Sequence, residues 1–236
     1  MGKKAQETVE QVADSAPKRR APRTKDEVAV LLKVPELTLH TVKLTIEGLS
    51  PLVMNRFGEK ARQEMHDKHA RGDAGKSRSA RAAKDFKAQF EAAKHKSSDG
   101  WYGIPCGSLV AAMISACRAG GIVMSRAKLA LWVEPDGYED DGTALTRITK
   151  GLPVYDERPV RNASGVPDLR ARPMFKPGWR ATVTIMFDPG MIDVDSIGNL
   201  LNRAGRQVGI LEGRRDSKKS AGMGWGSFRI LGSKEE

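Results

Sequence analysis

The segment with the clearest chemical character is the glycine-rich stretch at residues 209–226. It contains five glycines, four basic residues and two serines, so it combines a permissive backbone with many hydrogen-bond donors. This composition is typical of a loop that holds phosphate groups; a mobile surface loop between two strands is the alternative. The pattern GxxxxGK[ST] is absent, so we do not expect a nucleotide-binding P-loop. The candidate residues of this loop are Gly213, Arg214, Arg215, Lys218, Lys219, Gly222, Gly224 and Gly226.

Further arginines gather at residues 158–180, where Arg161, Arg170 and Arg172 stand among few acids. The planar guanidinium fork suits phosphates and base edges. We therefore expect these three arginines, together with Arg56, to contact nucleic acid, mainly at the phosphate backbone. The alternative is an internal ion-pair network with the neighbouring carboxylates of Asp156, Glu157 and Asp168.

Trp225 lies between Gly224 and Gly226 and is a candidate for stacking on an unpaired base. Stacking of this kind contributes about 1–3 kcal/mol per base and tolerates any sequence. Packing in the core is the alternative, because Phe228 and Ile230 follow on one face of the closing strand. The sequence leaves both interpretations open.

Patterns for catalysis or metal binding are weak. The four histidines, His40, His66, His69 and His95, belong to no HExxH, HxH or serine-triad arrangement. The acidic run at residues 134–141 lacks EF-hand spacing and is typical of a solvated turn. Cys106 and Cys117 have no CxxC spacing and are best explained as small core residues. We therefore expect no catalytic residue, no metal and no cofactor.

The whole chain is strongly basic. Its 236 residues include 40 Lys and Arg against 29 Asp and Glu, which gives a net charge of +11. Basic side chains neutralise phosphates and release counterions, so this excess favours a polyanionic partner, with solubility alone as the alternative. No apolar run approaches the roughly 18–20 residues that span a membrane, and no signal-type apolar core follows the N-terminus. We therefore expect a cytoplasmic protein without a membrane partner.

The first half of the chain contains an arm, a strand and an insertion before its first compact unit. Residues 1–36 form a basic arm, in which prolines among the basic residues favour disorder. A strand at residues 37–49 follows, and residues 55–98 form an insertion of two polar helices. The compact unit begins at Trp101, with Ser108 as the N-cap of a helix at residues 109–119 and an apolar strand at residues 127–133.

The second half begins with an excursion at residues 138–179, where short strand signals alternate with glycine and proline turns and predict a β-hairpin. A strand at residues 181–187, a helix at residues 194–204 and a closing strand at residues 227–231 follow, before a tail at residues 232–236. Without the two insertions, at about 55–98 and 138–179, the order is β-α-β-β-α-β. The sequence therefore predicts an α+β fold with a ferredoxin-like or RRM-like core over residues 37–231.

Three segments of this core resemble the RAMP superfamily, the RRM-like backbone and guide-processing subunits of CRISPR effector complexes. Residues 42–53 resemble the family's first strand and its SPL turn, and residues 102–113 resemble the IPGSSLKGAL entry into its first helix. Residues 222–230 resemble the GxGxxxF loop before the last strand. Cys106 and Gly107 replace the Gly-Ser of the helix entry, and no guide-processing histidine is recognisable. The layout is also similar to that of tailed-bacteriophage proteins, which implies a stand-alone relative.

The residues and the resemblance together favour a protein that binds single-stranded RNA or DNA on a sheet face, with loops that hold the backbone. The family's backbone subunits stack along a strand, which implies a homo-oligomer or filament. Large apolar residues in the insertions need cover from another protomer or from the parent domain: Phe86, Phe90, Met174, Phe175 and Trp179. The alternatives are a metal-independent RAMP-type endoribonuclease, using His40 or an acid near the glycine-rich loop, and a phage structural or assembly protein.

Overall fold

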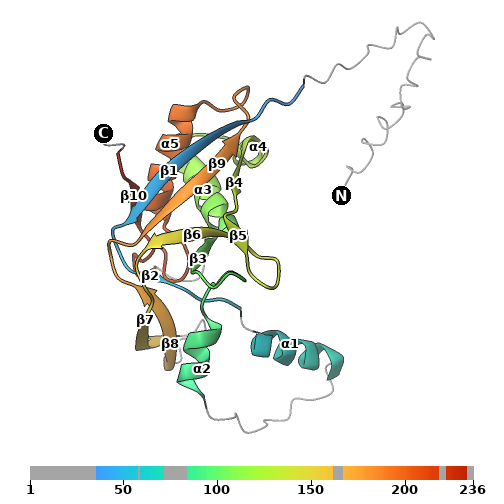
Figure 1. Ribbon diagram of the computed structural model, residues 1–236, viewed down its shortest axis with the longest axis vertical. Helices are drawn as coiled ribbons and strands as arrows, with labels where there is room; N and C mark the ends of the chain where they lie inside the picture. The colour runs from blue at the N-terminus through green and yellow to red at the C-terminus, as the bar shows by residue number, and fades with distance from the viewer. Residues whose placement is uncertain (1–35, 58, 72–83, 162–166, 218–221, 233–236) are drawn as a thin grey trace, which may run out of the picture. The chain divides into compact units, whose positions relative to one another are not determined.

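The computed structural model describes residues 36–57, 59–71, 84–161, 167–217 and 222–232. The chain divides into two units, Met1–Glu36 and Leu37–Glu236, and the secondary structure in Figure 1 belongs to the second. The arm predicted at residues 1–36 lies outside the described residues except for Glu36, and the tail lies outside them except for Gly232.

The larger sheet contains seven strands: β1 (His40–Gly48), β3 (Gly103–Pro105), β4 (Leu131–Glu134), β5 (Gly137–Tyr138), β6 (Ala144–Lys150), β9 (Arg180–Phe187) and β10 (Phe228–Ile230). All of its pairings are antiparallel. β1 lies between β10 and β9, while β4 and β6 share the other edge of β9. Four of the strands therefore lie side by side in the order β10-β1-β9-β4.

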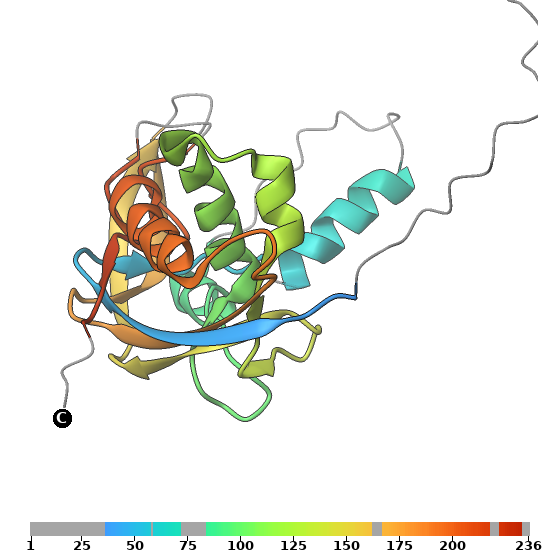
Figure 2. The same ribbon diagram turned by 90° about the horizontal axis from the view of Figure 1, so that it is seen from above.

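Two helices, α3 (Cys106–Gly120) and α5 (Val194–Arg203), lie on one face of this sheet (Figure 2). The alternation of side chains along β1 and β9 explains why, because every second residue is apolar. Ile46 and Ile185 belong to the set that is fully buried in the core with the two helices. The residues between them, such as Thr45 and Thr182, lie on the opposite face. The core is therefore a layer between the sheet and the pair α3 and α5.

A smaller antiparallel sheet has the order β2-β8-β7 and comprises β2 (Leu52–Val53), β7 (Val154–Arg161) and β8 (Pro167–Phe175). β7 and β8 form the hairpin predicted within residues 138–179, so that prediction is confirmed. α1 (Glu59–Arg71) and α2 (Phe86–Ala92) form the helical insertion, and α2 packs against β8. The described chain is thus a mixed α and β fold with antiparallel sheets.

The large aromatic residues of the insertions are covered by this chain itself. Phe175 and Trp179 are buried in the core. The rings of Phe90 and Tyr155 lie 5.3 Å apart between centroids, and Phe86 is half-buried. Of the two explanations that the sequence left open for their cover, the structure supports packing on the parent domain.

Two local predictions were wrong. The helix expected to start after Ser108 begins at Cys106, and the Ser108 hydroxyl donates to the Pro105 carbonyl at 2.7 Å instead of capping a helix. Most of the strand expected at residues 127–133 belongs to α4 (Met124–Ala130), and only β4 continues as strand. A short apolar run has no periodicity that separates a buried strand from a buried helix, and here Ala127 and Ala130 pack closely in helical form.

The close packing of Gly48 against Trp179 predicts that a methyl group added at position 48 destabilises the protein. A Cβ at Gly48 would lie 1.9 Å from Trp179 Nε1, which donates to the Ser50 carbonyl at 3.0 Å. We expect Gly48→Ala to lower the free energy of unfolding by about 1–3 kcal/mol, because the indole must move. Urea denaturation measures this change.

Gly198→Ala is the matched control, because a Cβ at this position within α5 meets nothing within 4 Å. Alanine is a better helix former than glycine, so this variant should be more stable by up to about 1 kcal/mol. A Gly48→Ala protein as stable as the wild type would show that the indole does not fix the end of β1.

Candidate nucleic-acid interface

The glycine-rich loop follows α5 and a single π-helical turn, η2 (Ala204–Val208). Leu211 has a φ of 60°, the one positive φ of a non-glycine residue in the described part of the chain. The loop is held against β2 and the turn before it, since the Glu212 amide donates to the Val53 carbonyl and the Gly226 amide donates to the Pro51 carbonyl. The two arms of the loop are joined by a bond from the Ile210 amide to the Gly226 carbonyl.

Most glycines of this loop are required by its own packing. A Cβ at Gly226 would lie 1.9 Å from the Ile210 carbonyl oxygen, and one at Gly222 would lie 2.4 Å from the Arg214 carbonyl oxygen. A Cβ at Gly213 would lie 2.4 Å from the Trp225 ring. Only at Gly224 is the space nearly open, with Arg215 Nε the nearest atom at 3.8 Å. The glycines are therefore explained by the close packing of the loop on itself, and they do not by themselves indicate an open binding site for a ligand.

Arg214 and Arg215 are exposed, and their guanidinium groups bond to backbone carbonyls. Arg214 donates to the carbonyls of Asp216 and Leu211, and Arg215 donates to the carbonyl of Arg206 at 3.0 Å. Within the described residues, no carboxylate oxygen lies within 4.0 Å of either guanidinium. Both side chains therefore present positive charge to solvent from a fixed position.

A second pair of cations lies beside them. Arg206 of η2 is exposed, and Arg118 near the end of α3 is bonded to Asp216 of the loop. The Ser115 hydroxyl also donates to Asp216. The bond from Ser115 is the largest cause that lowers the pKa of the Asp216 carboxyl below its usual range, and the bond from Arg118 is the next. We call Arg118, Arg206, Arg214 and Arg215 the basic surface. Its four positive charges and the one negative charge of Asp216, which bonds to Arg118, give a net charge of +3.

Two of the three arginines predicted on the hairpin, Arg170 and Arg172, lie outside the basic surface and are paired with carboxylates. Arg172 bonds to Glu212 at 3.1 Å, and Arg170 lies 3.7 Å from both Glu212 and Asp168. Here the structure favours the internal ion-pair network over free phosphate ligands. Arg161 is placed in β7 opposite Pro167, at the end of the hairpin.

Three other cationic residues were predicted to contact nucleic acid: Arg56, Lys218 and Lys219. Arg56 is bonded to Glu139 and Asp141, so its charge is compensated within the protein. Lys218 and Lys219 lie outside the described residues. Of the predicted cationic residues, the structure therefore brings together Arg214 and Arg215, and adds Arg118 and Arg206, which sequence analysis missed because they lie in or directly after helices.

Trp225 is buried, with 8% of its surface exposed. The guanidinium of Arg158 lies 4.6 Å from the centre of its ring, and Gly213 closes against the ring. An indole covered in this way offers no face to a base. The structure therefore supports the core-packing interpretation of Trp225 and not the stacking one.

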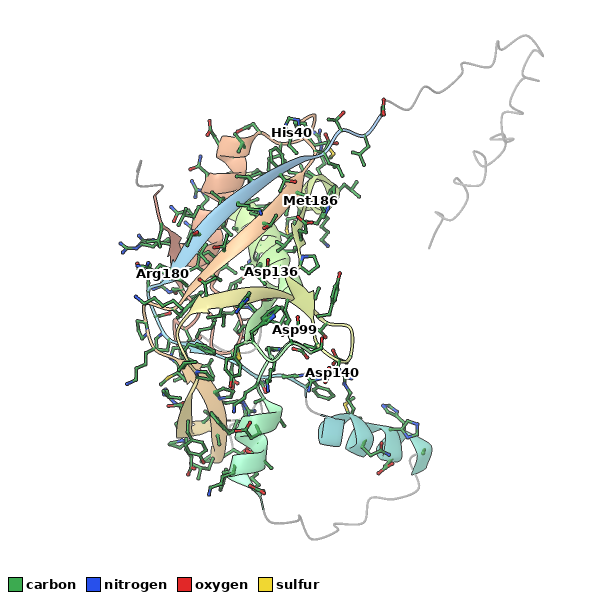
Figure 3. All side chains as sticks on the ribbon, viewed as in Figure 1. His40, Asp99, Asp136, Asp140, Arg180 and Met186 are labelled. Carbon is green, nitrogen blue, oxygen red and sulfur yellow. The ribbon has the colours of Figure 1, made fainter. Side chains whose placement is uncertain are left out.

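On the face of the large sheet opposite α3 and α5, β1 and β9 carry hydroxyl and charged side chains together with Met186, and β4 places Trp132 beside Met186. Thr45 and Thr182 bond across β1 and β9 at 3.3 Å, and Glu47 is bonded to both Arg180 and Arg229. These two arginines hold the pKa of Glu47 below its usual range. Figure 3 labels Arg180 and Met186, which lie near the two ends of β9. Because β1 and β9 carry no aromatic residue on this face, their contacts to a strand would be hydrogen bonds and not stacking.

Sequence analysis also missed a buried polar cluster around Glu139. His95 Nδ1 lies 2.6 Å from one Glu139 oxygen, and Arg56 donates to the other. The Glu139 side chain is almost wholly buried, so these bonds tie the segment after α2 to the β5–β6 turn. Burial lowers the pKa of His95, although the Glu139 carboxylate acts to raise it. His40, the histidine suggested for cleavage, packs edge-on against Phe187 at 5.9 Å.

Comparisons with known proteins do not assign this chain to a family. A scan against protein-family models and a search of curated proteins found no match to this chain. Among the described residues, no helix has both the length and the apolar character needed to cross a membrane. The same residues contain no group of three or more His, Cys, Asp or Glu side chains that could hold a metal ion.

The partly buried His95 predicts that stability falls in mild acid. Its pKa is lowered in the folded state, so the unfolded chain binds the proton more readily below its ordinary pKa of about 6.5. Stability is thus fully present above that pH and is lost as pH falls towards the folded-state pKa. We expect the free energy of unfolding, measured by urea denaturation, to decrease as the pH falls below about 6.5.

His95→Gln is the control, because the glutamine amide can still donate to Glu139 but does not titrate. In this variant the free energy of unfolding should change little over the same pH range. An equal decrease in both proteins would assign the titration to another group.

Proposed function

We propose that this protein binds single-stranded nucleic acid, RNA or DNA, through the basic surface. The observation that carries the proposal is the state of Arg214 and Arg215, which are exposed, held in place by backbone carbonyls, and without a carboxylate within 4.0 Å among the described residues. Guanidinium groups that the protein leaves uncompensated are available to phosphate oxygens, which they bind with charge-assisted hydrogen bonds.

The pattern of compensation supports this choice of surface. Arg56, Arg170 and Arg172 each have a carboxylate partner in the protein, so a phosphate would have to displace that partner. Arg214 and Arg215 bond only to neutral carbonyls, and the Asp216 carboxylate acts on Arg214 through space without bonding to it, so a phosphate would be the first anion bonded to either guanidinium. Contacts of this type set affinity and its salt dependence without selecting a base sequence.

The arrangement of strands supports a ferredoxin-like or RRM-like core. Along the chain, β1, α3, β4, β9, α5 and β10 follow the order β-α-β-β-α-β, and the strands lie in the spatial order β10-β1-β9-β4. In the proposed protein the basic surface, which lies on α3, η2 and the glycine-rich loop, holds the phosphate backbone. This layout agrees with the resemblance to the RAMP superfamily, which stays part of the proposal.

Side-by-side assembly along a strand is proposed as the mode of oligomerisation. A series of single strands of increasing length tests it, because the mass of the complex should rise in steps. Cleavage of labelled RNA without added metal would instead favour the endoribonuclease. The absence of any salt-sensitive binding to short strands would favour a structural or assembly protein.

Replacement of the two uncompensated arginines tests the interface itself. Arg214→Ala with Arg215→Ala should weaken binding to every single-stranded sequence by a similar factor. The slope of log K against log salt should flatten by about 1.4, since each phosphate contact on a single strand contributes about 0.7. Fluorescence anisotropy of labelled oligo(U) and oligo(dT) over a salt series measures both quantities.

The control removes the same charge from another element. Arg126→Ala with Lys128→Ala changes two exposed residues of α4, so it reproduces the loss of net charge without touching the basic surface. The control should lower affinity slightly and leave the slope nearly unchanged. Equal effects of the two double variants would mean that net charge, and not the basic surface, governs binding.

A further inference from the structure

One carboxylate interrupts the basic surface, and it comes from the glycine-rich loop. Asp216 Oδ2 accepts hydrogen bonds from the Ser115 hydroxyl and from the Arg118 guanidinium, both on α3. Arg118 also donates to Ser115 Oγ at 2.6 Å and to the Ser115 carbonyl at 3.1 Å, which ties the guanidinium to its own helix. A hydroxyl and a fixed guanidinium thus converge on a single anionic oxygen.

The donors around this oxygen are those that bind phosphate. Serine hydroxyls and arginine forks donate to carboxylate and phosphodiester oxygens with the same geometry, because both acceptors are anionic oxygens. We propose that Ser115 and Arg118 form a phosphodiester-binding site that Asp216 occupies in the free protein. This inference rests on the proposed function and adds a self-blocking contact to its surface.

The exposure of the contact allows a ligand to reach it. The Arg118 side chain is 58% exposed and that of Asp216 is 34% exposed. An ion pair this open to solvent contributes little to stability, typically less than about 1 kcal/mol. An incoming phosphodiester would therefore compete with a weak internal partner.

The exchange requires only the Asp216 side chain to move. The Asp216 amide donates to the Val208 carbonyl, and its carbonyl accepts from Arg214 Nε, so its backbone is held independently of its carboxylate. A phosphodiester carries the same single charge as the carboxylate, so the exchange leaves the charge around Arg118 unchanged. In the free protein Asp216 keeps Arg118 in the orientation that a phosphate needs.

Removal of the charge of Asp216 should therefore strengthen binding. In Asp216→Asn the amide keeps the size of the side chain and can still accept from Ser115, which preserves the loop. We expect this variant to bind oligo(U) and oligo(dT) about three to ten times more tightly than the wild type. The slope of log K against log salt should steepen by about 0.7, because the phosphate that Arg118 binds no longer displaces a carboxylate of the same charge.

Asp99→Asn is the charge-matched control, because Asp99 is exposed in the turn after α2 and makes no ion pair in the described part of the chain (Figure 3). Addition of Arg118→Ala to Asp216→Asn should return both affinity and slope to wild-type values. If the wild type binds but Asp216→Asn binds no more tightly than Asp99→Asn, the self-blocking site is wrong while the proposed function stands. If neither protein shows salt-sensitive binding, the proposed function fails and this site fails with it.

Discussion

The structure depends on the packing of the Trp179 indole at the end of β1. The ring lies against Gly48, donates to the Ser50 carbonyl and meets Phe228 edge-on, with centroids 6.3 Å apart. Backbone bonds join the same residues, because Gly48 donates to the Trp179 carbonyl and accepts from Gly178. One buried side chain therefore fixes where β1 ends, where β9 begins and where β10 is placed. The turn after β1 holds the glycine-rich loop, because the Pro51 carbonyl accepts from the Gly226 amide.

Charge compensation then decides which part of this basic protein is available to a partner. Carboxylates of the protein pair with Arg56, Arg170, Arg172 and Arg180, so much of the positive charge is already satisfied internally. The loop beside α3 and η2 differs, because its arginines are held by neutral carbonyls. Net charge attracts a polyanion over long range, whereas uncompensated and positioned guanidinium groups determine where it binds.

The glycine-rich loop shows how structural and functional requirements meet in one segment. Its glycines allow two arms of chain to pack within van der Waals contact of each other and of Trp225. That packing fixes the backbone from which Arg214 and Arg215 project, and it brings Asp216 to α3. A loop that was merely flexible would lose more conformational entropy on binding than a loop fixed in this way.

The sequence by itself determined the period-two pattern of β1 and β9, the helix α5, the β7–β8 hairpin and the closing strand, because local periodicity and turn residues specify these elements. It also located the two arginines that the structure leaves uncompensated. It could not separate a buried helix from a strand at α4, nor show that Trp225 is covered. Only the tertiary structure decided which arginines meet a carboxylate and which helix faces the loop, because residues such as Ser115 and Asp216 lie about a hundred positions apart in the chain and meet only after folding.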